Sequence, residues 1–269
     1  MGNVNTLLEG CALDYQALEE RLNSFLRLRT YPVGVKLAKS EAEFPERTRR
    51  PKNIGLKLAT CQGIALARRN LWIVGFTVED MACIPSAVLY GFLGVKRAED
   101  IKEAMKTMGW RRSDEAYDDF AIHLTPLNLG SYSGVYFAPL RRMNEDPDVL
   151  LVYCNSAQAM RLIHAANYKG GIITSSFIGV AESCRAVIET VRSGKPGIFI
   201  PGAGDRAIAQ TADDEIIFAA PYAMVEDLLE GLDKAGTNVG VRYPLPMVPY
   251  QPLPPPSWTA LEGKVSKPN

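Results

Sequence analysis

The sequence predicts an α/β or α+β fold, with a single compact domain whose mixed sheet is flanked by helices and followed by a proline-rich C-terminal arm. Apolar or alternating runs of strand length recur between segments whose apolar residues have helical spacing. Hydrophobic residues make up 47% of the 269 and charged residues 22%, an ordinary globular composition. No clean linker interrupts the chain, and prolines cluster only after Arg242. We therefore expect one domain over residues 1–241 and an extended arm over residues 242–269.

The first half of the chain predicts helices and strands in turn. Apolar residues at helical spacing, with charges between them, predict a helix over residues 13–29. Residues 31–37 alternate and predict a strand. Further strands are expected at 54–59 and 71–76, and further helices after Cys61, after Cys83 and at 97–108.

The second half continues the alternation from about residue 132. Strands are expected at 132–139, 149–153, 171–177, 197–200 and 215–219, and helices at 156–167, around Cys184 and at 221–235. Pro221 suits the first turn of the last helix. Because helices link many of these strands, we expect some parallel pairing, and so a mixed sheet.

Charge and composition limit the classes of partner. The formal net charge is zero, which argues against nucleic-acid binding because that requires a basic surface. No apolar stretch has the length of a membrane span, so we expect no membrane partner. No secretory signal is visible and the five cysteines are an odd number, so a reducing cytoplasm is expected. We expect a small-molecule ligand, and a homo-oligomer is left open.

Three cysteines share one local setting. Cys61, Cys83 and Cys184 each open a predicted short helix with an apolar stripe. Unpaired N–H groups and partial positive charge at a helix start favour thiolate, the form that attacks electrophiles or binds metal. Three thiolates suit zinc, copper(I) or an iron–sulfur cluster and leave one coordination position open. The leading hypothesis is therefore a metal centre, a [4Fe–4S] cluster above all, with redox or lyase chemistry at the open iron.

Two alternatives stand beside the metal hypothesis. Free cysteine is usually a buried small hydrophobe, so the protein could bind a small molecule without metal, with purely structural cysteines. One of the cysteines could instead be the nucleophile of a thiol enzyme, which requires a depressed pKa. The sequence names no reaction.

Carboxylates and glycines near the predicted helix starts form a second group of candidates. Gly204, Asp205 and Arg206 follow a predicted strand, and we expect Asp205 and Arg206 to hold a small anionic ligand, since arginine offers a bidentate fork to carboxylate or phosphate. A tight turn with a local ion pair is the simpler interpretation. Further carboxylates suit capping, metal ligation or proton relay, namely Glu79, Asp80, Glu182 and the run Asp213, Asp214 and Glu215.

Several of these motifs together resemble the DUF169 family of bacterial and archaeal proteins, over about residues 14–235. The resemblance is carried by Tyr31-Pro32-Val33-Gly34-Val35-Lys36-Leu37, Cys61-Gln62, Ala67-Arg68, Thr77-x-Glu79-Asp80-x-x-Cys83, Phe177-Ile178-Gly179, Gly204-Asp205-Arg206 and Asp213-Asp214-Glu215. It implies a soluble prokaryotic protein with recurrent cysteines at Cys61, Cys83 and Cys184, and brings no settled activity. The sequence departs from the family at Cys83-Ile84-Pro85-Ser86, where relatives tend to have Cys-Pro followed by glycines.

Overall fold

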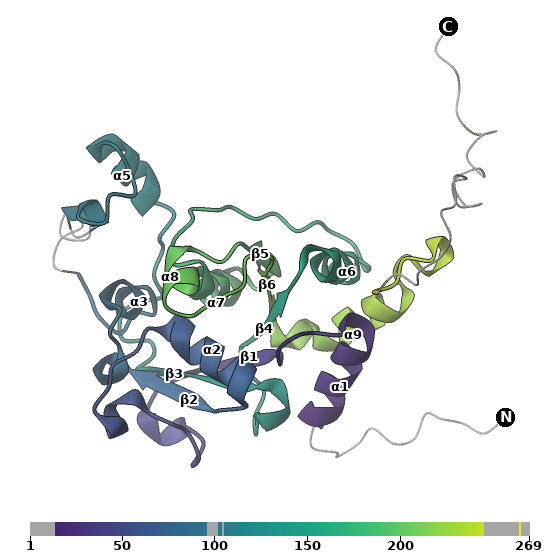
Figure 1. The fold of residues 1–269 in the computed structure, drawn as a ribbon, viewed down its shortest axis with the longest axis horizontal. Helices are drawn as coiled ribbons and strands as arrows, with labels where there is room; N and C mark the ends of the chain where they lie inside the picture. Colours follow the sequence, from purple (N-terminus) through teal and green to yellow (C-terminus); the bar gives the residue numbers. More distant parts are fainter. Residues whose placement is uncertain (1–13, 96–101, 104, 245–263, 265–269) are drawn as a thin grey trace, which may run out of the picture.

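The computed structural model describes residues 14–95, 102–103, 105–244 and 264. A six-stranded sheet runs through the centre, and helices cover both of its faces (Figure 1). Its strands are β1 (Val33–Ala38), β2 (Val74–Thr77), β3 (Gly134–Pro139), β4 (Val149–Cys154), β5 (Gly197–Phe199) and β6 (Ile216–Pro221). Across the sheet the order is β2-β3-β1-β4-β6-β5. The predicted single compact domain of helices and strands is confirmed.

The helices form two outer layers. One face of the sheet packs against α2 (Thr60–Asn70), α3 (Ile84–Leu89) and α7 (Glu182–Ser193). The opposite face packs against α1 (Tyr15–Leu26), α6 (Ser156–Ala166) and α9 (Val225–Lys234). Alternate residues of β4 serve the two cores, with Leu151 on the first face and Leu150 on the second. This explains why β4 reads as a continuous apolar run, since a strand buried on both faces has no polar side.

All pairs of named strands are antiparallel, so the expected parallel pairing is wrong. The helix α2 does connect two strands of the same direction, β1 and β2, but β3 from later in the chain lies between them. In the same way β6 lies between β4 and β5. Parallel pairing occurs among the described residues only as isolated bridges, Arg49 with Val74 and Leu58 with Met81.

The two halves of the sheet repeat one arrangement about the central β1–β4 pair. Each half has a strand, a helix that opens with a cysteine, an edge strand, and a third strand inserted between the two. Cys61 lies 13 residues before the first residue of β2, and Cys184 lies 13 residues before the first residue of β5. Cys83 lies six residues after the last residue of β2, and Asp205 lies six residues after the last residue of β5. The halves are therefore equivalent in topology, and Asp205 occupies the position in the second half that Cys83 has in the first.

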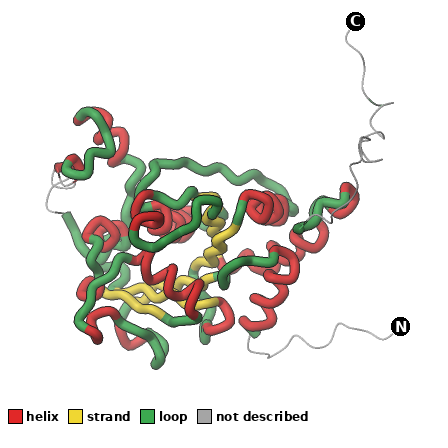
Figure 2. The backbone as a smooth tube through the Cα atoms, viewed as in Figure 1, coloured by secondary structure: helices red, strands yellow, loops and turns green. Residues whose placement is uncertain are grey.

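Two predicted strands are wrong. Residues 54–59 are irregular because Gly55, at φ 71°, turns the chain away after a 3₁₀ turn, Pro51–Ile54. Residues 171–177 belong to an extended loop, 167–181, which crosses from α6 toward α7 as a long green tube in Figure 2. Positive φ at Gly170 and Gly171 prevents a strand from starting there.

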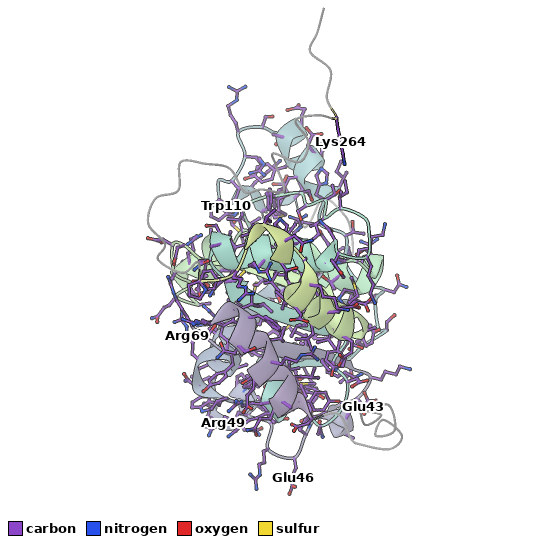
Figure 3. All side chains as sticks on the ribbon, turned by 90° about the vertical axis from the view of Figure 1, so that its right-hand side faces the viewer. Glu43, Glu46, Arg49, Arg69, Trp110 and Lys264 are labelled. Atoms are coloured by element: carbon purple, nitrogen blue, oxygen red, sulfur yellow. The ribbon has the colours of Figure 1, made fainter. Side chains whose placement is uncertain are left out.

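Parts of two predictions fall outside the described residues, namely much of the helix at 97–108 and nearly all of the proline-rich arm. Side chains project all around the outline of the molecule in Figure 3, with Glu43 and Glu46 at the end away from Trp110. Within the described ranges, no helix has the length and apolar character needed to cross a membrane.

Candidate metal centre

Each of the three cysteines does stand at the start of a helix. Cys61 is the second residue of α2, Cys83 is the residue just before α3, and Cys184 is the third residue of α7. Pro85 lies in the first turn of α3, where its missing N–H has no helical partner to lose. The local pattern of the sequence therefore predicted these positions correctly.

The fold brings the three helix starts together. The Cys184 sulfur lies 3.2 Å from Thr60 Oγ1, beside Cys61, and 3.4 Å from Ser86 Oγ, one turn after Cys83. Those two hydroxyl oxygens are 2.8 Å apart, which closes a buried polar triangle between α2, α3 and α7. Cys61 and Cys83 share a small apolar cluster with Ala209. Residues 61, 83 and 184, remote in sequence, thus line one region.

The pKa values of all three thiols are raised, so burial opposes the effect of the helix starts, which favours thiolate. Burial raises the pKa of Cys184 to about 12, although Ser86 and Thr60 oppose the rise. Burial also raises the pKa of Cys61, and Cys184, Asp205 and Cys83 each add to the rise because negative charge would accumulate there. The pKa of half-buried Cys83 is raised by burial as well. A thiol nucleophile needs the opposite shift, so this arrangement favours neither thiol catalysis nor bare thiolates without a cation to offset their charge.

Two further polar groups are buried beside the thiols. Asp205, only 3% exposed, belongs to the short helix α8 (Ala203–Ala207). Its Oδ2 accepts a hydrogen bond from Gly202 N at 2.9 Å, and the side chain and backbone N–H of Ser183 also hydrogen-bond the carboxylate. Burial raises the pKa of the Asp205 carboxyl, and neighbouring Ser183 opposes the rise. The hydroxyl of Tyr90, a fully buried residue, has no hydrogen-bond partner among the described residues.

The thiols, Asp205 and Tyr90 interact electrostatically. Burial first, and then the possible charges of Cys184, Tyr153, Cys61 and Asp205, raise the pKa of Tyr90. A buried carboxyl with a raised pKa, a buried phenol and three thiols therefore occupy one region. Unpartnered buried polar atoms are rare in folded proteins and often mark a functional site.

Gly204 and Arg206 lie in α8 with Asp205, but neither is directed at the thiols in the way expected from the sequence. Arg206 donates to the Ala212 carbonyl at 3.0 Å and lies 3.6 Å from the exposed carboxylate of Asp213. Its guanidinium is thus directed to the following turn. A Cβ on Gly204 would meet nothing within 4 Å, whereas one on Gly202 would lie 2.9 Å from the Gly179 carbonyl oxygen. The glycine that permits a close approach is therefore Gly202, which sequence reasoning missed.

The remaining candidate carboxylates are occupied by structural partners. Asp80 forms a buried ion pair with Arg50 and caps Thr77 N. Exposed Glu79 binds half-buried Lys52, and Asp214 binds Arg29. Glu182, fully buried, accepts from the backbone of 178 and 179 and pairs with Arg185. None of these contacts leaves a carboxylate directed at the thiols.

Arg68 and Glu215 form a buried ion pair next to the site. The two hydrogen bonds measure 2.5 and 2.9 Å, and the guanidinium also lies 4.0 Å from the ring centre of Tyr153. Burial raises the pKa of Glu215, but the hydrogen bonds and charge of Arg68 outweigh it and hold the pKa below its usual value. The partners are 147 positions apart, so no local pattern could have paired them.

A separate cavity of about 910 Å³ lies between α7 and the 167–181 loop. Six hydroxyl side chains line it: Thr125, Thr174, Ser175, Ser176, Thr190 and Ser193. The Thr190 hydroxyl is buried and has no hydrogen-bond partner in the described part of the chain. Arg192 and Lys195 contribute positive charge at its rim. Sequence reasoning missed this cavity because its lining comes from distant segments.

In the described ranges, no three or more His, Cys, Asp or Glu side chains are arranged to hold a metal ion.

Comparison with known proteins gives one family match. The profile of the DUF169 family, described as "Uncharacterised ArCR", matches residues 21–231. No curated protein and no solved structure matches the chain. The match covers most of the sequence and includes all three helix-start cysteines, Asp205 and the complete sheet. The chain therefore belongs to the DUF169 family.

Proposed function

We propose that this protein binds an iron–sulfur cluster through Cys61, Cys83 and Cys184. The observation that carries the proposal is that three thiols, from three separate helix starts, lie near enough to influence one another electrostatically, in a region that also holds the unpartnered hydroxyl of Tyr90. Packing alone does not require three cysteines at equivalent places on three helices. A cationic centre would offset the cost of burying thiolates, which is the main reason that the thiol pKa values are raised.

A cluster suits the arrangement better than a single metal ion. Sulfide separates the irons of a cluster, so its thiolate ligands stand farther apart than the ligands of one ion. The members of the thiol trio influence one another electrostatically, as the ligands of one cluster would. Three cysteines leave one iron of a [4Fe–4S] cluster without thiolate, and such an iron is suited to redox or lyase chemistry on a small bound molecule. A reducing cytoplasm is the compartment that fits these free thiols.

The test is the iron and acid-labile sulfide content of protein purified without oxygen, with its visible absorption spectrum. We expect iron and sulfide in near-equal amounts and their loss in Cys61→Ser, Cys83→Ser and Cys184→Ser. Cys154→Ser is the matched control, because Cys154 is equally buried but faces the opposite core, where its Sγ lies 3.6 Å from the Ile216 carbonyl oxygen. Colourless, folded wild-type protein without metal would contradict the proposal.

A second candidate function is favoured by the large cavity along α7. Its six hydroxyls and the two basic residues at its rim suit a small molecule that carries both hydroxyl groups and negative charge. The other arginine of the lining, Arg185, is already bound by Glu182 and Glu189, so Arg192 and Lys195 supply the uncompensated charge. This function needs no metal.

Ribose 5-phosphate is a suitable probe, with ribose and inorganic phosphate as its two halves. We expect the intact probe to raise the melting temperature more than either half, and Arg192→Ala/Lys195→Ala to remove the shift. Arg47→Ala is the control, because Arg47 is not among the residues that line the cavity. Equal shifts in the double variant and the wild type would contradict the assignment.

A further inference from the structure

The cavity between α7 and the 167–181 loop is larger than a sugar phosphate requires. At about 30 Å³ for each water molecule, its volume of about 910 Å³ holds roughly 30 non-hydrogen atoms, about twice the number in ribose 5-phosphate. Pockets for small molecules span about 300–1,000 Å³, so this cavity lies near the upper end of that range. The hydroxyls and cations of the lining therefore match one part of a ligand, and room remains for a further group.

Apolar side chains form another part of the lining. Leu89, Ile188 and Phe199 are buried members of the core on the α7 side of the sheet, so they give the cavity an apolar floor. Two exposed apolar residues also line it, Ile122 just after α5 (Asp114–Ala121) and Ile172 in the 167–181 loop. An apolar floor with apolar side chains at the rim suits a flat ring system, such as a nucleobase.

Three serines of the lining are arranged as hydrogen-bond donors. In each, the hydroxyl oxygen accepts a hydrogen bond from a protein N–H, at 2.9, 2.8 and 3.1 Å in Ser175, Ser176 and Ser193. A hydroxyl has one hydrogen as well as two lone pairs, so each serine can still donate that hydrogen. Arg192, which donates to the Thr125 carbonyl at 3.2 Å, and Lys195 are further donors. A lining rich in donors suits a ligand rich in acceptor oxygens, as a phosphorylated ribose is.

We infer that the cavity binds a nucleoside phosphate, with its phosphate at Arg192 and Lys195, its ribose against the serine hydroxyls and its base on the apolar floor. This inference rests on the second candidate function, which covers the phosphate and the hydroxyls, and adds the base. Ile122 and Ile172 then cover the base from the solvent side.

The test is calorimetric titration of the full chain with adenosine 5′-phosphate (AMP), ribose 5-phosphate, adenosine and hexyl phosphate. We expect AMP to bind about tenfold more tightly than ribose 5-phosphate, since burial of roughly 60 Å² of apolar ring surface is sufficient for that factor. Arg192→Ala/Lys195→Ala should bind AMP no more tightly than adenosine.

The outcomes separate the inference from the function on which it rests. Equal affinities for AMP and ribose 5-phosphate would overturn the inference and leave the second candidate function standing. Hexyl phosphate that binds as tightly as AMP would overturn it too, because any apolar anion would then be accepted. No binding of AMP or ribose 5-phosphate would refute both.

The variant Ile122→Ser/Ile172→Ser tests the position of the base. Both side chains are exposed, so we expect an unchanged melting temperature but an affinity for AMP close to that for ribose 5-phosphate. Ile54→Ser is the matched control, because Ile54 is similarly exposed and is not among the residues that line the cavity. An unchanged affinity of the double variant for AMP would mean that the base lies elsewhere, against the inference.

Discussion

At the scale of single residues, the Arg68 guanidinium stabilises the domain through a buried ion pair and also lies next to the candidate centre. It is 1% exposed, forms both hydrogen bonds of an ion pair with Glu215, and its charge reaches Asp205. Arg68→Met would leave the Glu215 carboxylate buried and uncompensated. Removing one partner of a buried pair costs about 3–5 kcal/mol, so we expect a loss of that size in urea unfolding.

The double variant Arg68→Met/Glu215→Leu serves to separate charge from packing. It leaves no buried charge, so most of the lost stability should return. The neighbouring pair of Arg29 and Asp214 has similar geometry but is exposed, so Arg29→Ala should change stability little. An Arg68→Met protein as stable as the wild type would refute the importance of the buried pair.

At the scale of helices and strands, close packing depends on particular glycines. A Cβ on Gly231, in α9, would lie 2.4 Å from the Ala165 carbonyl oxygen in α6. Backbone cannot yield as a flexible side chain can, so Gly231→Ala should separate the two helices and cost about 1–3 kcal/mol. Thermal unfolding would measure this as a lower midpoint.

Gly204→Ala provides the opposite expectation within the same experiment. Nothing lies within 4 Å of its added Cβ, and alanine favours a helix over glycine by about 1 kcal/mol. We therefore expect Gly204→Ala to be neutral or stabilising and to keep the iron content of the wild type. A stability loss equal to that of Gly231→Ala would mean that Gly204 has a role that the geometry of the site does not contain.

At the scale of the whole molecule, the metal-free protein should lose stability as pH rises above about 9. When folding raises the pKa of a thiol, the thiol stabilises the folded state fully at pH values below its unfolded pKa. This stabilisation is lost as the pH rises through the pKa of the folded state. For Cys184 that interval runs from 9.0 to about 12. Urea midpoints measured across this interval should fall less steeply in Cys184→Ala than in the wild type. Parallel curves would contradict the shift.

Local sequence patterns predicted the positions of many helices and strands. They could not predict the order of the strands in the sheet or which distant residues meet. Apolar spacing located β1, β4 and α1, and the setting of each cysteine predicted its helix start. Nothing local indicates that β3 inserts between β1 and β2, because insertion is decided by which strands share the best apolar faces. For the same reason Tyr90 and the α7 cavity escaped prediction, while Thr60, directly before Cys61, could have been suspected from its position alone.

The strand order also bears on how the chain is made. β1 lies at the middle of the sheet, yet its partners β3 and β4 follow it by about 100 residues. At synthesis rates of about 5–20 residues per second, β1 leaves the ribosome roughly 5–20 s before either neighbour exists. During that interval an apolar strand with two open edges is exposed to other chains. Chaperone binding to the nascent first half, and aggregation of fragments that end before residue 134, are therefore expected features of the biogenesis of this fold.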